Sequence, residues 1–279
     1  METIVQYFET IPSSHRSLIL VGGIALFWII ESAVPLFAFR SSKWKHAGIN
    51  IFFTLTTIVV NFVLAFILVW SSDWAVANNF GVLQWLDMPL WATAIVGLML
   101  LDFGGAYLAH WTEHRVPLLW KFHLIHHTDQ ELDTTSANRH HPGESVIRFV
   151  FTTAAVLLFG APIWLVFLYQ SMSVVLSQFN HANITVPKWI DKSLGLIFVT
   201  PDMHRVHHHY RLPYTDTNFG NIFSIWDRLF GTYSAVDNRK LVYGVDTHMN
   251  QEDHQNIGRM LRIPFESTAK VDHELDQLG

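Results

Sequence analysis

Four long apolar runs constrain the fold of this chain more than any other feature of its sequence. A helix needs about 20 apolar residues to cross the hydrocarbon core of a bilayer, and every run reaches that length. The first is interrupted only by Glu31, and the third contains Asp102 near its end. The runs, which predict an all-α integral membrane helical bundle, cover residues 17–38, 49–70, 88–109 and 149–179.

The fourth run is too long for one spanning helix. Its 31 residues without a charge would make a helix of about 46 Å at 1.5 Å per residue. Gly160, Ala161 and Pro162 lie inside it, and proline breaks or kinks a helix. We therefore predict a helical hairpin that enters and leaves on one side. One long, tilted and kinked helix is the alternative.

The composition agrees with a membrane protein and excludes several functions. Only 15% of the residues are charged, against roughly 25% in typical soluble domains. The chain has no cysteine, which excludes a disulfide scaffold, a thiolate zinc site, a cysteine-ligated iron–sulfur cluster and a thiol nucleophile. A net charge of −5 argues against nucleic acid as a partner, because nucleic-acid binding favours a basic face.

The charges of the loops predict how the bundle is oriented. Residues 39–48 carry Arg40, Lys43 and Lys45 and no acid, whereas residues 71–87 carry two aspartates and no base. Basic loops stay in the cytoplasm, so the first loop is expected inside and the second outside. The third run then returns to the cytoplasm at His110. The N-terminus would lie outside, and it shows no signal-peptide pattern.

Histidine is concentrated in one part of the chain. Twelve of the 17 histidines lie between positions 110 and 209. Residues three and four apart on a helix share a face, so the histidines of one group can converge. The groups are His110 with His114, then His123, His126 and His127, then His204, His207 and His208, with His181 alone between the last two.

Such spacing favours a metal centre. Neutral imidazole is a ligand for zinc, copper, iron and nickel, and eight histidines overfill one ion and fit two. The sequence therefore predicts a helical cap on the cytoplasmic side that holds a histidine-rich dimetal site. His110 to His114 also reads as H-x-x-E-H, the inverted zinc-protease motif. In that alternative the chain is a membrane zinc metalloprotease, and Glu113 is the base.

The three histidine groups resemble those of the sterol desaturase and fatty acid hydroxylase superfamily of membrane di-iron enzymes. Further stretches are similar to bacterial-type members, which implies a bacterial inner membrane as the location. The resemblance covers roughly residues 95–235. We accordingly expect N-terminal transmembrane helices in residues 1–94, a catalytic domain in 95–235 and a polar C-terminal tail in 236–279. The further stretches are residues 114–120, 139–144, 180–183, 200–208 and 226–233.

The resemblance implies a membrane oxidoreductase that uses O2 and external electrons. Its substrate would be a lipid C–H bond (sterol, fatty acyl or related), which it hydroxylates or desaturates. Its cofactors would be two iron ions, and zinc can replace iron after heterologous expression because it binds imidazole more tightly. The implied ligands are His110, His114, His123, His126, His127, His181, His204, His207 and His208, with His141 as a further ligand or a neighbour of the ligands.

The environment of the ligands and the source of electrons can also be predicted. Ligand histidines usually donate their second N–H to a carboxylate or carbonyl, and Glu113, Glu144, Asp202 and Asp227 are the candidates. The chain has no dinucleotide-binding fingerprint of the GxGxxG type and no cysteine. We therefore expect a separate electron-donor protein as a partner.

Overall fold

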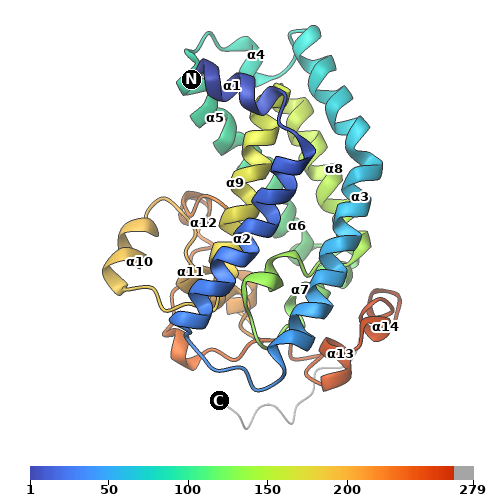
Figure 1. Cartoon of the computed structure of the whole chain (residues 1–279), viewed down its shortest axis with the longest axis vertical. Coiled ribbons are helices and arrows are strands. Elements are labelled where there is room, and N and C mark those ends of the chain that lie inside the picture. The colour runs from blue at the N-terminus through green and yellow to red at the C-terminus, as the bar shows by residue number, and fades with distance from the viewer. Residues whose placement is uncertain (267–279) are drawn as a thin grey trace.

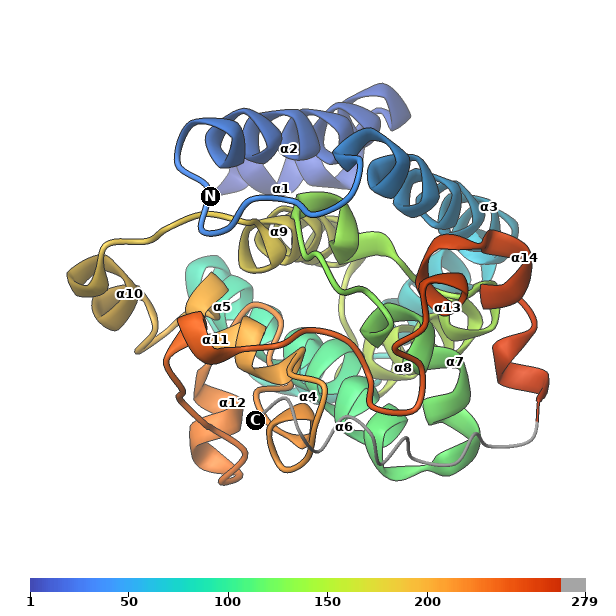
Figure 2. The ribbon, with the colours of Figure 1, turned by 90° about the horizontal axis from the view of Figure 1, so that it is seen from below.

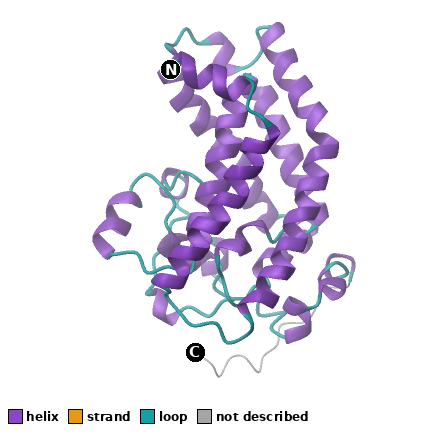
Figure 3. Ribbon diagram, in the orientation of Figure 1, coloured by secondary structure: helices purple, strands orange, loops and turns teal. Residues whose placement is uncertain are grey.

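A computed structural model describes residues 1–266, and these residues form helices joined by loops, with no β-strand among them (Figure 3). The α-helices are α1 (Glu2–Glu9), α2 (Ser13–Ala33), α3 (Lys43–Ala77), α4 (Val82–Trp85), α5 (Leu90–Asp102), α6 (Leu108–Arg115), α7 (Pro117–His127), α8 (Pro142–Phe159), α9 (Ile163–His181), α10 (Lys188–Leu194), α11 (Pro201–His207), α12 (Ile225–Leu229), α13 (Gln251–Gln255) and α14 (Ile257–Met260). The π- and 3₁₀-turns are η1 (Phe103–Tyr107), η2 (Thr134–Asn138), η3 (Tyr214–Asp216), η4 (Asn238–Lys240) and η5 (Ile263–Phe265).

An upright bundle of long helices forms most of the molecule (Figure 1). Four helical stretches are long and apolar enough to cross a membrane, which confirms the prediction of an all-α integral membrane bundle. Helix α9 is not one of them, and it packs inside the bundle against α1, α2 and α5. The four stretches are Ser13–Ala33, Lys43–Trp85, Leu90–Arg115 and Pro142–Phe159.

The fourth apolar run folds as the predicted hairpin. Helix α8 ends at Phe159, and Gly160 adopts a left-handed conformation with φ of 68°. A Cβ atom at Gly160 would lie 2.3 Å from the carbonyl oxygen of Phe80, so the turn requires glycine both for its backbone angle and for space. Pro162 then precedes the first residue of α9, where its fixed φ starts a helix without strain.

The third apolar run contains an irregular turn that the sequence does not reveal. Between α5 and α6, residues Phe103–Tyr107 form a π-helix, which inserts one residue into the helical register. This turn packs against α8, where a Cβ atom at Gly104 would lie 2.9 Å from the Phe159 ring. Glycine therefore allows the close approach that positions α6 beside the other histidine-bearing helices.

The two acids that interrupt the apolar runs are buried and hold loops at one end of the bundle. Glu31 accepts hydrogen bonds from the backbone N–H groups of Thr134 (3.0 Å) and Asn183 (2.8 Å). Asp102 accepts from the backbone N–H groups of Ile222 and Phe223, both at 3.1 Å. Both side chains are therefore buried and have structural partners.

A cap of short helices and loops covers the end of the bundle opposite the N-terminus (Figures 1 and 2). Helices α7 and α11 lie in this cap. The segment from α13 to η5 packs against α7, where Met260 and Ile263 join a core with Leu124 and Ile125. The predicted polar tail therefore begins with packed short helices up to residue 266, and its remainder lies outside the described residues.

Candidate metal centre

Nine of the predicted ligand histidines meet at the junction between the bundle and the cap. They come from α6, α7, α9 and α11, which the fold brings to one point from distant parts of the sequence. Eight of the nine are buried, and the ninth, His114, has a side chain with no exposed surface. They form two groups, and within each group one ligand atom from every residue lies within 4.8 Å of all the others.

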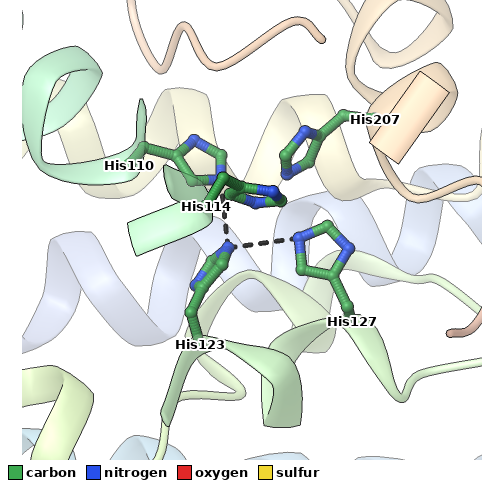
Figure 4. Close-up of side chains that lie close together, drawn as sticks. All are labelled: His110, His114, His123, His127 and His207. Carbon is green, nitrogen blue, oxygen red and sulfur yellow. Dashed lines mark hydrogen bonds between the residues drawn. The ribbon is translucent and has the colours of Figure 1, made fainter. Parts of the chain in front are cut away.

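The first group, called cluster A, consists of His110, His114, His123, His127 and His207 (Figure 4). Their imidazole rings point toward a common centre. The Nε2 atom of His123 lies 3.1 Å from the Nε2 atoms of both His110 and His127. The ring of His207 enters from the opposite helix, with its centroid 4.4 Å from that of His110.

The second group, called cluster B, consists of His126, His181, His204 and His208. The Nε2 atom of His181 lies 3.1 Å from those of His126 and His204 and 3.3 Å from that of His208. The two clusters adjoin, because the rings of His127 and His208 stack with centroids 4.7 Å apart. The structure thus brings the nine histidines into two neighbouring groups, each of which could hold a metal ion.

Each His-x-x-His-His group divides between the two clusters. His123 and His127, four residues apart, belong to cluster A, whereas His126 belongs to cluster B. The group on α11 divides in the opposite sense, because His204 and His208 belong to cluster B and His207 to cluster A. A helix advances 100° per residue. Residue i+4 therefore lies about 40° to one side of residue i, whereas residue i+3 lies about 60° to its other side. The three histidines of a group therefore do not converge on one ion.

The hydrogen bonds of cluster A determine which ring nitrogen carries the proton. The Nδ1 atom of His110 lies 2.8 Å from the carbonyl oxygen of Phe219, and that of His207 lies 2.7 Å from the carbonyl oxygen of Thr217. A carbonyl oxygen only accepts, so both Nδ1 atoms donate. In a neutral imidazole Nε2 is then a bare lone pair, and it points to the centre of the cluster.

Cluster A therefore fits a cation. His123 donates from Nδ1 to Glu144 Oε1 at 2.7 Å, so its contact with His110 Nε2 brings two lone pairs to 3.1 Å. Burial, together with neighbouring histidines, lowers the pKa of His123 and His207 well below the ordinary value, which keeps both rings neutral. The buried Nε2 atoms of His114 and His207 have no hydrogen-bond partner among the described residues. A positive ion at the centre satisfies all of these lone pairs at once.

Cluster B offers the same kind of ligand atoms, but hydrogen bonds at Nδ1 fix fewer of its rings. His181 donates from Nδ1 toward the carbonyl oxygen of Ser177 and the side-chain oxygen of Asn180, both at 2.8 Å. Burial and neighbouring histidines lower the pKa of His126, His204 and His208 well below the ordinary value. Four neutral imidazoles directed at one point also fit a metal ion.

One buried carboxylate links the two clusters. Glu144 Oε1 accepts from His123 of cluster A and also from Nδ1 of His140 at 2.6 Å. The ring of His140 in turn stacks on His126 of cluster B, with centroids 4.9 Å apart and planes 17° apart. Arg148 bridges Glu144 at 3.0 Å and Glu113 at 2.9 Å. The carboxylates of Glu113 and Glu144 are thus engaged in an ion-pair network behind the histidines.

The loop that follows α11 supplies partners that sequence reasoning missed. Asp216 lies 3.2 Å from Nδ1 of His114, and the carbonyl groups of Thr217 and Phe219 hold His207 and His110. Asp227 fixes this loop by accepting from the backbone N–H groups of Phe219 and Gly220, both at 2.8 Å. Asp227, a predicted partner of the ligands, therefore acts one step further out. A backbone carbonyl leaves no trace in a sequence, so these contacts had no signal there.

Two other predicted residues lie away from the clusters. His141 is not in either group: its Nδ1 accepts from the backbone N–H of Gly143 at 3.0 Å, and its Nε2 lies 3.3 Å from the carbonyl oxygen of Leu261. It caps α8 and ties it to the segment after α14. Asp202 pairs with Arg205 at 2.9 Å and contacts no ligand histidine.

These features define a helical integral membrane protein with two adjoining all-histidine clusters that can hold metal ions. A family model described as fatty acid hydroxylase matches residues 94–232. The chain belongs to the sterol desaturase and fatty acid hydroxylase superfamily.

Relatives in this superfamily act on different lipids. The chain is 31% identical over 150 residues to the ornithine lipid hydroxylase of Rhizobium tropici, covering 54% of this chain and 43% of that protein. It is 33% identical over 175 residues to human alkylglycerol monooxygenase, covering 60% and 36% respectively. A fatty acid hydroxylase of a Lecanicillium species is 32% identical over 177 residues, covering 56% and 45%. The aligned part spans less than half of each of these relatives, and no solved structure matches the chain significantly.

Proposed function

We propose that this chain is a membrane-bound di-iron lipid hydroxylase. The observation that supports this most strongly is the pair of adjoining clusters, in which nine buried histidines direct Nε2 lone pairs at two centres. Two iron ions bound there would supply the activation of O2 and the oxidation of a C–H bond. Hydroxylation is favoured over desaturation because the three relatives described above are named hydroxylases or monooxygenases.

The residues around the clusters have clear tasks in such a reaction. The carbonyl groups of Thr217 and Phe219 and the carboxylate of Glu144 orient the rings through Nδ1. Burial of the rings excludes bulk water from the centre, which protects a reactive site from side reactions. Helices α6, α7 and α11, which carry most of these histidines, lie at the end of the bundle where the cap begins (Figure 1), so a lipid substrate would keep its tail in the bilayer while one carbon reaches the site.

The direction of the site in the membrane is part of the proposal. Arg40 lies in the connection between α2 and α3, and Lys43 and Lys45 lie in the first turn of α3, at the end of the bundle where the cap begins (Figure 1). Asp73, near the C-terminal end of α3, and Asp87, between α4 and α5, lie at the other end. Because basic segments stay in the cytoplasm, this distribution supports a cytoplasmic active site. The membrane that we propose is a bacterial inner membrane.

A zinc metalloprotease is the competing function, and the ion pair of Glu113 does not favour it. A protease base must be free to activate a zinc-bound water, whereas the Glu113 carboxylate pairs with Arg148 at 2.9 Å. His110 and His114 also share their cluster with three further histidines. The metalloprotease hypothesis assigns no role to cluster B.

Metal content tests the proposal directly. The chain purified after expression in iron-rich medium should contain about two metal ions, as two-metal sites require. His127→Ala should lower the content of cluster A and His208→Ala that of cluster B, whereas His15→Ala, far from both, should retain both ions. A content of one ion that neither cluster substitution changes would refute the dimetal centre. Zinc in place of iron would leave the question of the metal open, so iron reconstitution accompanies the measurement.

The reaction itself can be followed with isotopic oxygen. Membranes of cells that express the chain under ¹⁸O₂ should contain a lipid with one added ¹⁸O atom that is absent from cells expressing His127→Ala. A lipid that loses two hydrogens without gaining oxygen would indicate desaturation instead. Peptide cleavage that requires Glu113 but not O2 would favour the protease.

A further inference from the structure

A part of the cap projects sideways from the bundle, outside the four candidate membrane spans. It consists of residues 188–197, which include α10, and residues 225–230, which include α12, and is called the lateral shelf below. Figures 1 and 2 show α10 standing away from the bundle. The two parts are joined, because Ser224 Oγ and Arg228 Nη2 both donate to the carbonyl oxygen of Gly195 at 2.8 Å.

The lateral shelf exposes large apolar side chains. Trp189 is 72% exposed, Leu196 66% and Leu229 67%, and Ile197 and Phe230 are also more than half exposed. Large apolar side chains that are exposed together on a protein indicate a contact with another molecule or a membrane. Lys188 and Lys192, also exposed, flank Trp189 on the same short helix.

The shelf lies beside the spanning helices. Phe198 follows it directly and stacks on Phe223 with ring centroids 5.8 Å apart, and both rings pack against the buried core that includes Leu98, Leu101 and Trp164. Figure 1 shows α10 at the same height as the lower part of α2, one of the candidate spans. The exposed residues of the shelf therefore lie level with the ends of the spanning helices, where the surface of the membrane is expected.

We propose that the lateral shelf lies in the membrane interface, in the leaflet nearest the histidine clusters. Leu196, Ile197 and Leu229 contact acyl chains, and Trp189 lies at the headgroup level, where tryptophan is enriched. Lys188 and Lys192 extend to lipid phosphates, as lysines do at the ends of membrane segments. These lysines also line a groove of about 1100 Å³ between α10 and residues 233–238, which leaves room for headgroups beside the helix. The occupant of this surface is thus the phospholipid leaflet itself and not a soluble protein.

The chain suits a depth measurement because it has no cysteine of its own. Single cysteines replace Leu196, Ile197 and Lys192, each is spin-labelled, and the protein is placed in nanodiscs of equal parts phosphatidylcholine and phosphatidylglycerol. Collisions with O2, which concentrates in lipid, are compared with collisions with a water-soluble nickel chelate. Phe62→Cys on α3, 82% exposed, is the reference for lipid, and Arg262→Cys, exposed near the C-terminal end of the cap, is the reference for water.

The labels at 196 and 197 are expected to give an O2-to-nickel collision ratio several-fold above that at 262 and below that at 62, because Phe62 lies near the middle of α3. The label at 192 should fall between those at 197 and 262. Ratios at 196 and 197 equal to that at 262 would overturn the proposal, and the shelf would then be a water-facing surface for a soluble partner such as an electron donor. Unchanged thermal midpoints of the labelled variants verify that each one is folded. The result does not depend on the metal or on the reaction proposed for the chain.

Discussion

At the scale of single residues, Glu144 is the side chain whose replacement should affect both clusters. Glu144→Gln keeps the size of the side chain but removes the charge that accepts from His123, His140 and Arg148. Removing a partner that orients a ligand histidine typically lowers metal affinity by about 10–100-fold. We expect a loss of that order, measured by competition with a chelator of known affinity.

The matched control for this prediction is Glu252→Gln on the surface of the cap, where Glu252 accepts a hydrogen bond from the side chain of Asn256 at 2.9 Å. It should leave metal affinity unchanged. An unchanged affinity in Glu144→Gln, with the same helix content as the parent, would contradict the orienting role of Glu144. A loss of helix content would instead show that the ion pair with Arg148 mainly supports the fold, and the affinity would then be measured in Glu144→Asp.

The sequence predicted which histidines come together, but it did not predict how they divide between two clusters. Spacing shows that His123, His126 and His127 lie near one another, whereas the partner for each depends on how α7 faces α11 across the site. His141 illustrates the limit of motif reasoning. It stands beside His140 in a histidine-rich stretch, yet the two rings have different partners. His140 contacts Glu144, whereas the ring of His141 caps α8. The path of the backbone, which a motif does not show, determines this difference.

At the scale of elements, the turn between α8 and α9 offers a sharp test. Gly160→Ala places a side chain in the left-handed region and a Cβ atom 2.3 Å from the Phe80 carbonyl oxygen. The backbone strain alone costs about 1–2 kcal/mol, and the clash adds to it. The thermal midpoint in detergent should fall by several degrees.

Gly48→Ala on α3 is the control for this substitution. A Cβ atom there meets nothing within 4 Å, and alanine in a helix interior is favoured over glycine by about 1 kcal/mol. Its midpoint should therefore stay level or rise. Equal midpoints for Gly160→Ala and the parent would show that the hairpin turn tolerates another conformation.

The apolar runs were predictable because they depend on local composition. The hairpin was predictable because it depends on Gly160 and Pro162. The π-helix at residues 103–107 was not, since nothing in Phe-Gly-Gly-Ala-Tyr distinguishes a wide turn from an α-helical one. This turn packs against α8, where Gly104 lies close to the ring of Phe159. Such a contact between distant parts of the chain cannot be read from the local sequence.

At the scale of the whole molecule, the chain should depend on another protein for electrons. The sequence has no cysteine for an iron–sulfur cluster and no dinucleotide-binding fingerprint. The purified chain should therefore form hydroxylated lipid only when a reductase system is added, and not with NADPH alone. Turnover with NADPH and O2 as the only additions would contradict this expectation.

Metal removal should loosen the molecule as a whole, because the two clusters join α6, α7, α9 and α11. An ion at 100 times its dissociation constant stabilises a folded protein by about 2.7 kcal/mol, and 1 kcal/mol shifts the midpoint of a chain of this size by about 2–4 °C. Chelation should thus lower the thermal midpoint by about 5–10 °C for each ion, and added iron should restore it. The double variant His127→Ala with His208→Ala should start from the lower midpoint and not respond to the chelator. If the double variant responded as strongly as the parent, the stabilising ion would have to lie outside clusters A and B.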